Sequence, residues 1–425
     1  MSALTHDPSE YIRGLQQLLV SDKKKIAFLF GAGTSLAKKN EDSLIVPAIG
    51  KLTEMIVIEL SKTEKYKFAI EQIKKEIGDD KYNIETLLST IEQKGHVIGR
   101  GTLNGLTVED IDSIITEIKN QIRKIVSVHK EILLGNGLNN LIHTDFAEWI
   151  GRADRKYPIE VFTTNYDYFF ELGMEEMNIP YYDGFSGSYK PFFYSESVDD
   201  LSFSPTQTKL WKLHGSLGWH LDKENKKVWR KDSDSEDILI YPSSLKYADS
   251  KKQPYTALMD RLTNYLKQPD TILIICGYSF GDEHINERIV TALKSNTSAH
   301  VYVLFYDIIW KDGKKEYSLA EDSNLAKLAK ANGKMSIFGC RSAIIGCQTG
   351  NWKLKREPNK EDTINVNLYF DEDGPSNIAD PTKEEKKGEE DWTGEGELKI
   401  PDFTRFITFL QSMILHTKIN RGLSE

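Results

Sequence analysis

The sequence predicts an α/β protein with a mostly parallel sheet, and three observations support this prediction. Short apolar runs recur along the chain, as in strands that helices cover on both faces. Helical stretches separate most of these runs, which is typical of α/β folds. Small and polar residues follow several runs directly, at the sheet edge where such folds bind ligands. The runs are Ile26–Phe30, Ile159–Thr163, Lys209–Leu213, Ile238–Tyr241, Thr271–Cys276 and Val301–Tyr306, with Val366–Tyr369 as a further candidate.

A long helical insertion is expected between the first two strands. About 130 residues separate them, more than a simple crossover needs. Residues 50–145 contain "KLTEMIVIELSKTEKYKFAIEQIKKEIG" and "VEDIDSIITEIKNQIRKIVSVHKEILL", both with apolar positions at helical spacing. A further amphipathic helix, "KQPYTALMDRLTNYLKQ", precedes the strand that begins at Thr271.

The C-terminal part of the chain differs in character. Residues 354–396 include the charged stretch "PTKEEKKGEEDWTGEGE", which is typical of a solvated loop. The last apolar segment, "FTRFITFLQSMILHTKI", is expected to form an amphipathic helix that packs on the core or on another subunit. We therefore divide the chain into a ligand-binding domain, residues 1–310, and a C-terminal extension, residues 311–425.

Composition indicates a globular protein of the reduced cytoplasm. Hydrophobic residues make up 39% of the 425 residues, and the net charge of −9 disfavours direct binding to nucleic acid or anionic membrane. Neither a membrane-spanning apolar segment nor a signal peptide is recognisable. Cys276, Cys340 and Cys347 are odd in number and form no CxxC pair, so we expect neither disulfides nor zinc.

The first candidate motif is Gly31-Ala32-Gly33-Thr34-Ser35, directly after the first strand. The glycines would let the backbone approach a phosphate, and a helix following the loop would point its positive end at that phosphate. Leu36 stands where the dinucleotide fingerprint GxGxxG has its third glycine. A tight strand-to-helix turn would explain the same glycines.

Two further motifs follow later strands. In "VFTTNYDYFFE", Thr164, Asn165 and Asp167 lie between a strand and a helix, where an Asn or Asp would also serve as a helix cap. In "KLWKLHGSLGWH", His214 ends a strand and precedes Gly215; a histidine in this place is often structural.

The fourth motif is "TILIICGYSFGDEHIN", in which Gly277 and Ser279 suit contact with a ribose or phosphate. Asp282, Glu283 and His284 raise the possibility of a metal site, but a helix N-cap at Asp282 explains them better. Four such motifs at one sheet edge favour a site of dinucleotide size.

Together and in this order, the four motifs resemble the sirtuin fold, a Rossmann-like fold, and more narrowly the sirtuin-like (SIR2-like) domains of bacterial anti-phage defence proteins. The matching elements are the loop Gly31–Ser35, the Thr164-Asn165-x-Asp167 segment, His214-Gly215, and Gly277-Tyr278-Ser279. The resemblance covers about residues 20–310.

The chain also departs from the deacetylase sirtuins. Their zinc module with two CxxC pairs is missing, and so is the Gly-Ile-Pro-Asp-Phe-Arg segment, where only Pro47 of "IVPAIGKL" has a counterpart. The helical insertion takes the place of their peptide-binding lobe. The resemblance therefore implies cleavage of NAD+ by water rather than removal of acyl groups from lysine.

The resemblance also implies roles for the site residues. Thr34 and Ser35 would bind the pyrophosphate, and Asn165 would orient water or the nicotinamide amide. Asp167 would stabilise positive charge on the ribose, and His214 would act as a general base. The adenosine ribose would contact the residues that follow the later strands, Ser279 and Asp307.

Defence enzymes of this type need a trigger, and the sequence shows no recognisable sensor domain. The resemblance implies a homo-oligomer controlled by assembly with a HerA-type hexameric ATPase or helicase, with nucleic acid reached only through that partner. Two other functions stay open: a regulatory subunit that binds NAD or ADP-ribose without turnover, and a metal-dependent nuclease subunit.

Overall fold

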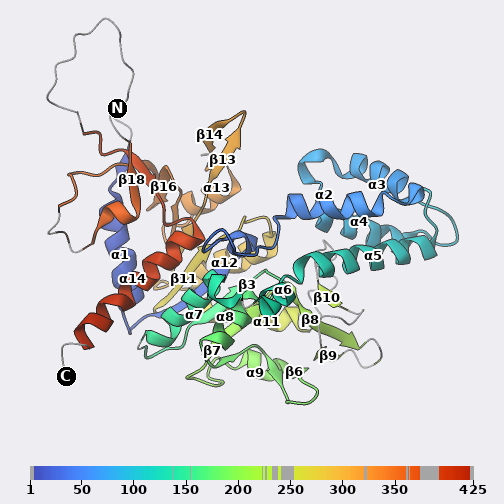
Figure 1. Ribbon diagram of the computed structural model, residues 1–425, viewed down its shortest axis with the longest axis horizontal. Coiled ribbons are helices and arrows are strands. Elements are labelled where there is room, and N and C mark those ends of the chain that lie inside the picture. The colour runs from blue at the N-terminus through green and yellow to red at the C-terminus, as the bar shows by residue number, and fades with distance from the viewer. Residues whose placement is uncertain are drawn as a thin grey trace, which may run out of the picture. The chain divides into compact units, whose positions relative to one another are not determined.

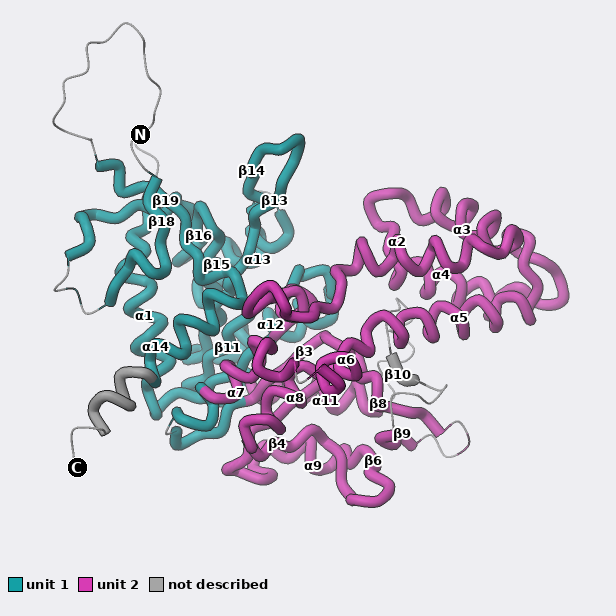
Figure 2. Tube along the Cα trace, in the orientation of Figure 1, with its two compact units in different colours: residues 1–29, 149–159, 266–425 teal, residues 30–148, 160–265 magenta. Residues whose placement is uncertain are grey.

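A computed structural model describes residues 4–135, 137–153, 155–222, 224, 227–231, 238–240, 253–319, 323–359, 362, 364–373 and 392–421. The chain forms two compact units, each assembled from separate segments (Figure 2). The first unit contains residues 1–29, 149–159 and 266–425, and the second contains residues 30–148 and 160–265. The division at residue 310 stays a prediction.

The first unit is built on a mixed sheet. Its strands lie in the order β1 (Thr5–His6), β17 (Gln348–Trp352), β16 (Ser342–Ile345), β15 (Met335–Phe338), β12 (His300–Leu304), β11 (Thr271–Cys276) and β2 (Lys25–Phe30). The pairs β11–β12, β12–β15 and β1–β17 are parallel, and β16 runs antiparallel to both neighbours. All six residues of β11 are buried, as its unbroken apolar sequence predicts.

Helices and two small antiparallel pairs complete the first unit (Figure 1). The helices are α1 (Pro8–Val20), α12 (Glu283–Ser295), α13 (Asn324–Lys330) and α14 (Phe403–Arg421). The pairs are β13 (Ile308–Lys311) with β14 (Lys314–Tyr317), and β18 (Phe370–Glu372) with β19 (Gly396–Leu398). The predicted C-terminal helix is confirmed as α14, whose Phe406 ring packs 6.2 Å from that of Phe28 in β2.

One strand prediction in this unit is wrong. Residues Val366–Leu368 form a 3-10 turn, η4, and the strand begins only at Phe370. Val366 and Tyr369, three residues apart, are both buried, as the three-residue period of a 3-10 turn allows, whereas Leu368 is 57% exposed. Much of the charged stretch 354–396 lies outside the described residues.

The second unit contains parallel strands in the order β3 (Glu160–Thr163), β7 (Thr208–Lys212) and β4 (Tyr181–Tyr182). A separate antiparallel sheet has the order β10 (Ile238–Ile240), β8 (Gly215–Asp222), β9 (Lys227–Arg230), β6 (Phe192–Phe193) and β5 (Phe185–Ser186). The run Ile238–Tyr241 was expected in the parallel sheet, and this was wrong. It pairs antiparallel with β8, the long strand after His214 that sequence reasoning missed, and Tyr241 lies outside the described residues.

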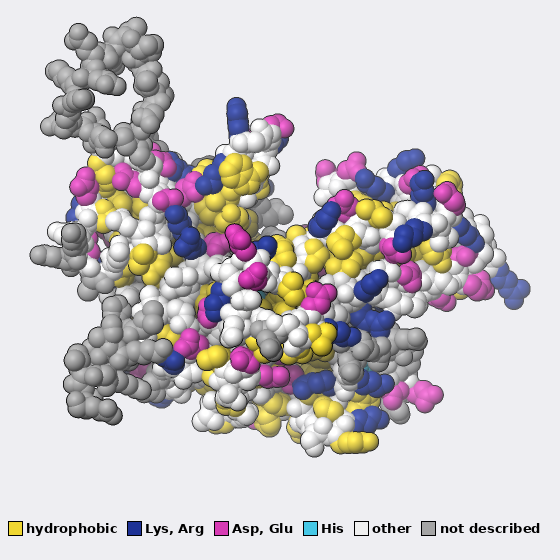
Figure 3. All heavy atoms as spheres, viewed as in Figure 1, with side chains coloured by type: hydrophobic (Ala, Val, Ile, Leu, Met, Phe, Trp, Pro, Cys, Tyr) yellow, Lys and Arg dark blue, Asp and Glu magenta, His cyan; other side chains and the backbone are white. Residues whose placement is uncertain are grey.

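Helices occupy most of residues 50–145, as the helical spacing predicts. They are α2 (Ile49–Leu60), α3 (Glu64–Ile77), α4 (Ile84–Val97), α5 (Val108–Val126), α6 (His129–Leu134) and the start of α7 (Ile142–Arg152), with short 3-10 turns η2 (Asp79–Lys81) and η3 (Gly137–Asn140). Asn83 and Thr107 form capping boxes that start α4 and α5. The apolar residues of the insertion form one core cluster that also includes Phe169 and Leu217, while Figure 3 shows acidic and basic side chains interspersed on its visible surface.

The remaining helices of the second unit are α8 (Phe169–Glu176), α9 (Ser195–Asp199) and α11 (Tyr255–Leu266), the last of which confirms the helix predicted before Thr271. In both units, helices accompany parallel strand pairs (β11–β12 and β12–β15 in the first, β3–β7 and β4–β7 in the second), so the predicted α/β class is confirmed. Within the described part of the chain, no helix has both the length and the apolar character that spanning a membrane requires.

Candidate active site

The glycine loop that follows β2 is a compact, buried turn. Residues Ala32–Leu36 form the 3-10 turn η1, and the Thr34 hydroxyl donates a 2.9 Å hydrogen bond to the Gly31 carbonyl. The predicted helix directly after this loop is wrong, because the next α-helix begins only at Ile49. A phosphate at this loop would therefore have no α-helix N-terminus directly behind it, and the hydroxyl hydrogens of Thr34 and Ser35 are donated to the Gly31 carbonyl and to Asp167.

Hydrogen bonds from the Asn165 side chain connect the glycine loop to the end of β3. Its side-chain nitrogen Nδ2 lies 3.1 Å from the Gly31 carbonyl, 3.0 Å from Thr34 Oγ1 and 2.7 Å from Ser35 Oγ. One amide has two N–H donors, so three acceptors share two hydrogens. The neighbouring Thr164 N–H donates to the Phe30 carbonyl at 3.1 Å. Sequence positions far apart thus converge where β3 ends.

Asp167 is bonded both to the glycine loop and to the start of α8, and its predicted action on the ribose stays a prediction. Its Oδ2 accepts a 2.6 Å hydrogen bond from the Ser35 hydroxyl, which ties it to the glycine loop. Its Oδ1 accepts from the Phe169 N–H at 3.0 Å, at the start of α8. The carboxylate is 3% exposed, so its negative charge acts in surroundings that screen it little.

His214 occupies the sharp turn between β7 and β8. Gly215 has a φ of +94°, a conformation that side chains with a Cβ rarely adopt, and this allows the chain to reverse directly after the histidine. Two backbone bonds hold the turn against the preceding segment: Leu213 N–H to the Thr163 carbonyl at 2.8 Å, and Leu217 N–H to the Tyr166 carbonyl at 3.1 Å. His214 is 9% exposed.

Two charged residues that sequence reasoning missed, Lys212 and Glu171, also belong to this cluster. The Lys212 ammonium lies 2.7 Å from Glu171 Oε1 and also donates to the Asp167 carbonyl. Burial raises the pKa of Glu171 to about 7, although the Lys212 charge opposes this shift. The available signal was Lys212 itself, one of two lysines in the predicted strand Lys209–Leu213, because a charge in a buried strand needs a partner.

Gly277 and Ser279 lie in the first unit, in the loop after β11. Gly277 has a φ of +67°, and Ser279 is exposed. The predicted N-cap is confirmed: the Asp282 carboxylate accepts from the His284 N–H at 3.0 Å and starts α12. Over the described ranges, no group of three or more His, Cys, Asp or Glu side chains is arranged to hold a metal ion.

Asp307, also in the first unit, is 1% exposed. Its Oδ1 accepts a 2.8 Å hydrogen bond from the Cys340 N–H, and its Oδ2 lies 3.4 Å from the Leu319 nitrogen. Burial raises the pKa of Asp307. The carboxylate therefore connects three chain segments, and a role in binding ribose stays a prediction.

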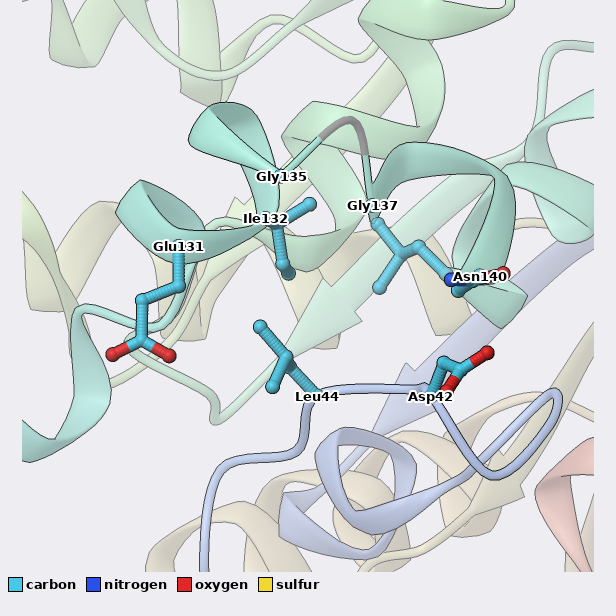
Figure 4. Close-up of a pocket in the computed structure, with 8 residues that line it drawn as sticks. Asp42, Leu44, Glu131, Ile132, Gly135, Gly137 and Asn140 are labelled. Carbon is cyan, nitrogen blue, oxygen red and sulfur yellow. The ribbon is translucent and has the colours of Figure 1, made fainter.

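The second unit also contains two cavities. One, of about 180 Å³, is lined by Glu171 and Ser216 together with the rings of Tyr168, Tyr181 and Trp219. The other, of about 240 Å³, lies between the loop after η1 and the α6–η3 segment. Figure 4 shows Leu44 and Ile132 facing one another across it, with Glu131 to one side. None of the predicted site residues lines either cavity.

Comparison with known proteins gives one family match. The family model described as "SIR2-like domain" matches residues 159–328, a range that includes Asn165, His214 and Gly277. A search of curated proteins found no match. A solved structure titled "Structural Basis for the Mechanism and Regulation of Sir2 Enzymes" aligns over 69% of this chain and 84% of its own, at 13% identity and a TM-score of 0.28. Residues 159–328 are thus similar to a SIR2-like domain.

Proposed function

We propose that this protein is an NAD+ hydrolase that releases nicotinamide and ADP-ribose. The observation that carries the proposal is the buried cluster in which Asn165 binds the glycine loop and Asp167 binds Ser35. The His214 turn is bonded to the same segment, and that segment lies in the part of the chain that matches the SIR2-like domain. An amide, a carboxylate and an imidazole are the groups that this reaction needs.

The chemistry follows from the bond that breaks. When the bond between the nicotinamide nitrogen and the ribose carbon breaks, positive charge develops on the ribose, as in glycoside hydrolysis. Nicotinamide leaves as a neutral molecule, so no general acid is required. A water molecule adds to the ribose carbon and loses a proton, giving ADP-ribose, nicotinamide and one H⁺. The protein must therefore stabilise charge, place the water and accept its proton.

Each residue of the cluster has a role in this reaction. The buried Asp167 carboxylate stabilises the positive ribose electrostatically. Asn165, whose side chain is fixed by the glycine loop, orients the water or the nicotinamide amide. His214 accepts the proton as a general base. Gly31–Ser35 hold the pyrophosphate, and Ser279 and Asp307 bind the adenosine ribose.

Hydrolysis suits the chain better than acyl transfer to or from lysine. Its three cysteines form no CxxC pair, whereas deacetylase sirtuins carry a zinc module with two such pairs. Helices α2–α5 occupy the stretch where those enzymes build a peptide-binding lobe. Water is then the acceptor that remains for the ribose carbon.

The test is nicotinamide release from NAD+, followed by chromatography. His214→Ala and Asn165→Ala should each slow release by about 100-fold or more, because a general base contributes about 10²–10⁴-fold and loss of an orienting group costs about 10²-fold. His220→Ala is the control, since His220 is also a buried histidine but lies six residues further along the chain, where it pairs across the sheet with Ile238 and Trp229. Thermal unfolding establishes that each variant is folded. Cleavage by folded His214→Ala and Asn165→Ala at the parent rate would refute the assignment.

We propose further that the activity depletes NAD+ in phage-infected bacterial cells, and that assembly with a HerA-type hexameric ATPase controls a homo-oligomer of this chain. This part rests on the resemblance of the four motifs to defence-associated sirtuin-like domains. Phage challenge of cells carrying either the parent chain or His214→Ala, with the ATPase supplied, extends the same test to the cell.

A further inference from the structure

Lys212 is a buried lysine at the centre of the candidate site. It is the last residue of β7, two positions before His214, and its side chain is 3% exposed. The ammonium lies over the Tyr168 ring, 5.1 Å from its centroid. A lysine ammonium is strongly hydrated in water, so removing it from solvent is unfavourable unless fixed partners replace that hydration.

The partners of Lys212 come from both chain segments that carry the proposed chemistry. Its Nζ donates to the Asp167 carbonyl and lies 3.5 Å from the Tyr166 carbonyl, on the segment that contains Asn165. It also lies 3.3 Å from Ser216 Oγ, two residues beyond His214. One side chain therefore connects the Asn165 segment with the His214 turn.

Glu171 holds this lysine in place. It lies on α8, four residues after Asp167, and its Oε1 is 2.7 Å from Lys212 Nζ. The second carboxyl oxygen, Oε2, is buried and has no hydrogen-bond partner in the described part of the chain. An arrangement with an unsatisfied buried oxygen is costly to stability, so packing alone does not explain it.

We infer that Lys212, oriented by Glu171, is a positioning residue that fixes the Asn165–Asp167 segment relative to the His214 turn. This inference rests on the proposed function, because it assigns the alignment of the residues that cleave NAD+. The lysine does not touch substrate in this scheme. It sets the distance and orientation between the amide and carboxylate on one side and the imidazole on the other.

The same strand supplies a matched control. Lys209 is 2% exposed and lies three residues earlier on β7. Its ammonium donates to the Ser204 and Gln207 carbonyls, at 2.6 Å and 2.7 Å, and reaches neither segment of the site. Replacing either lysine by methionine removes a buried ammonium from β7, but only Lys212→Met removes the connection.

The experiment uses the full chain with Lys212→Met, Lys209→Met and the double variant Glu171→Gln/Lys212→Met. Hydrogen exchange is measured by mass spectrometry on peptides covering residues 164–168 and 213–217, without NAD+. Lys212→Met should raise exchange in both peptides by about tenfold or more, since their fluctuations are no longer coupled. Lys209→Met should change exchange only near residues 204–208.

Steady-state nicotinamide release supplies the second readout. Lys212→Met should lower kcat by about tenfold or more and leave KM within about threefold, which is the signature of lost alignment rather than lost binding. The double variant, which leaves no uncompensated buried charge, should unfold at a temperature close to that of the parent and keep the low kcat. It also carries the measurement where Lys212→Met alone does not fold.

Three outcomes would overturn the inference: unchanged exchange in the two peptides, recovery of the parent kcat by the double variant, or an equal loss of kcat in Lys209→Met. Failure of the proposed function is recognised separately. If the folded parent chain releases no nicotinamide, that function is wrong, while the exchange data still decide whether Lys212 fixes the two segments.

Discussion

Two glycine loops of similar composition have opposite structures in this protein. Gly31–Ser35 follows β2 and Gly277–Gly281 follows β11, and both strands are apolar and buried. In the first loop, the hydroxyl-bearing residues Thr34 and Ser35 are 0% and 2% exposed and belong to a hydrogen-bonded cluster. In the second loop, Ser279 is exposed and its Oγ lies 3.4 Å from the Gly281 nitrogen.

The difference lies in where the stabilising partners come from. The first loop is held by Asn165, which is 130 positions from Ser35 in the sequence. The second is held by its own neighbourhood: Asn286 donates to the Phe280 carbonyl at 2.8 Å, and Asp282 caps the helix that follows. A strand followed by small residues can thus build either a fixed site by long-range bonds or an accessible loop by local ones.

The largest effect is expected for Asn165→Asp. The substitution removes both N–H donors that hold the first loop and adds a carboxylate near Asp167. We expect loss of nicotinamide release by more than about 100-fold and a decrease of about 1–3 kcal/mol in the free energy of unfolding, because buried acceptors lose their donors. Urea denaturation and the release assay measure both.

The same change in the second loop sharpens the comparison. Asn286→Asp removes the donor to the Phe280 carbonyl but leaves the Asp282 cap in place. It should be clearly less destabilising than Asn165→Asp. Equal losses in the two variants would show that both loops depend on their asparagines to the same extent.

A smaller effect is expected from a change of pH, and it acts through Glu171. The partner of Glu171, Lys212, donates to the carbonyl of Asp167, whose carboxylate binds Ser35 of the first loop. Its pKa is raised from 4.5 to about 7 in the folded protein. Between these values the unfolded chain has released the proton while the folded chain still binds it. This carboxyl therefore makes folding less favourable as pH rises through that window, and the contribution levels off above pH 7.

The variant Glu171→Gln removes this titration. The free energy of unfolding of this variant minus that of the parent should increase by about 1 kcal/mol or more from pH 5 to pH 7.5, since one pKa unit corresponds to about 1.4 kcal/mol. Urea denaturation at several pH values measures the difference. Glu176→Gln, an exposed change on the same helix, should run parallel to the parent. A Glu171→Gln curve parallel to the parent as well would contradict the assignment.

The smallest effect is expected from removing single hydroxyls. Ser35→Ala removes the donor to Asp167 Oδ2 and an acceptor for Asn165, so it should cost about 1 kcal/mol of stability. Ser279→Ala should change stability by less than about 0.5 kcal/mol, as exposed substitutions usually do. Thermal unfolding of the pair compares the loops directly. A Ser279→Ala loss as large as that of Ser35→Ala would remove the distinction between them.

The local pattern of apolar residues was sufficient to predict many of the helices and strands. Apolar runs marked β2, β3, β11 and β12, the run Lys209–Leu213 with its two lysines marked β7, and helical spacing marked the insertion. The pattern failed where a 3-10 turn or an antiparallel pair takes the place of the expected parallel strand. Val366 and Tyr369 are buried by a 3-10 turn, and the run from Ile238 pairs with β8, whose glycines concealed it as a strand.

The site was predictable as a set of positions but not as a network. Small and polar residues after apolar strands identified Gly31, Asn165, Asp167 and His214. Which of them bond to one another depends on how strands separated by long insertions align, and no local pattern contains that information. Lys212 shows the limit: its charge in a buried strand was visible, yet its partner Glu171 lies 41 positions earlier and on a helix.

The buried pair also restricts how this sequence can evolve. Replacing Lys212 alone leaves the Glu171 carboxyl buried beside no counter-charge, and replacing Glu171 alone leaves the ammonium in the same position. Each single step passes through a less stable protein, whereas loss of both charges does not. Natural variation at these two positions should therefore be correlated, with lineages keeping the pair or exchanging it together for neutral side chains.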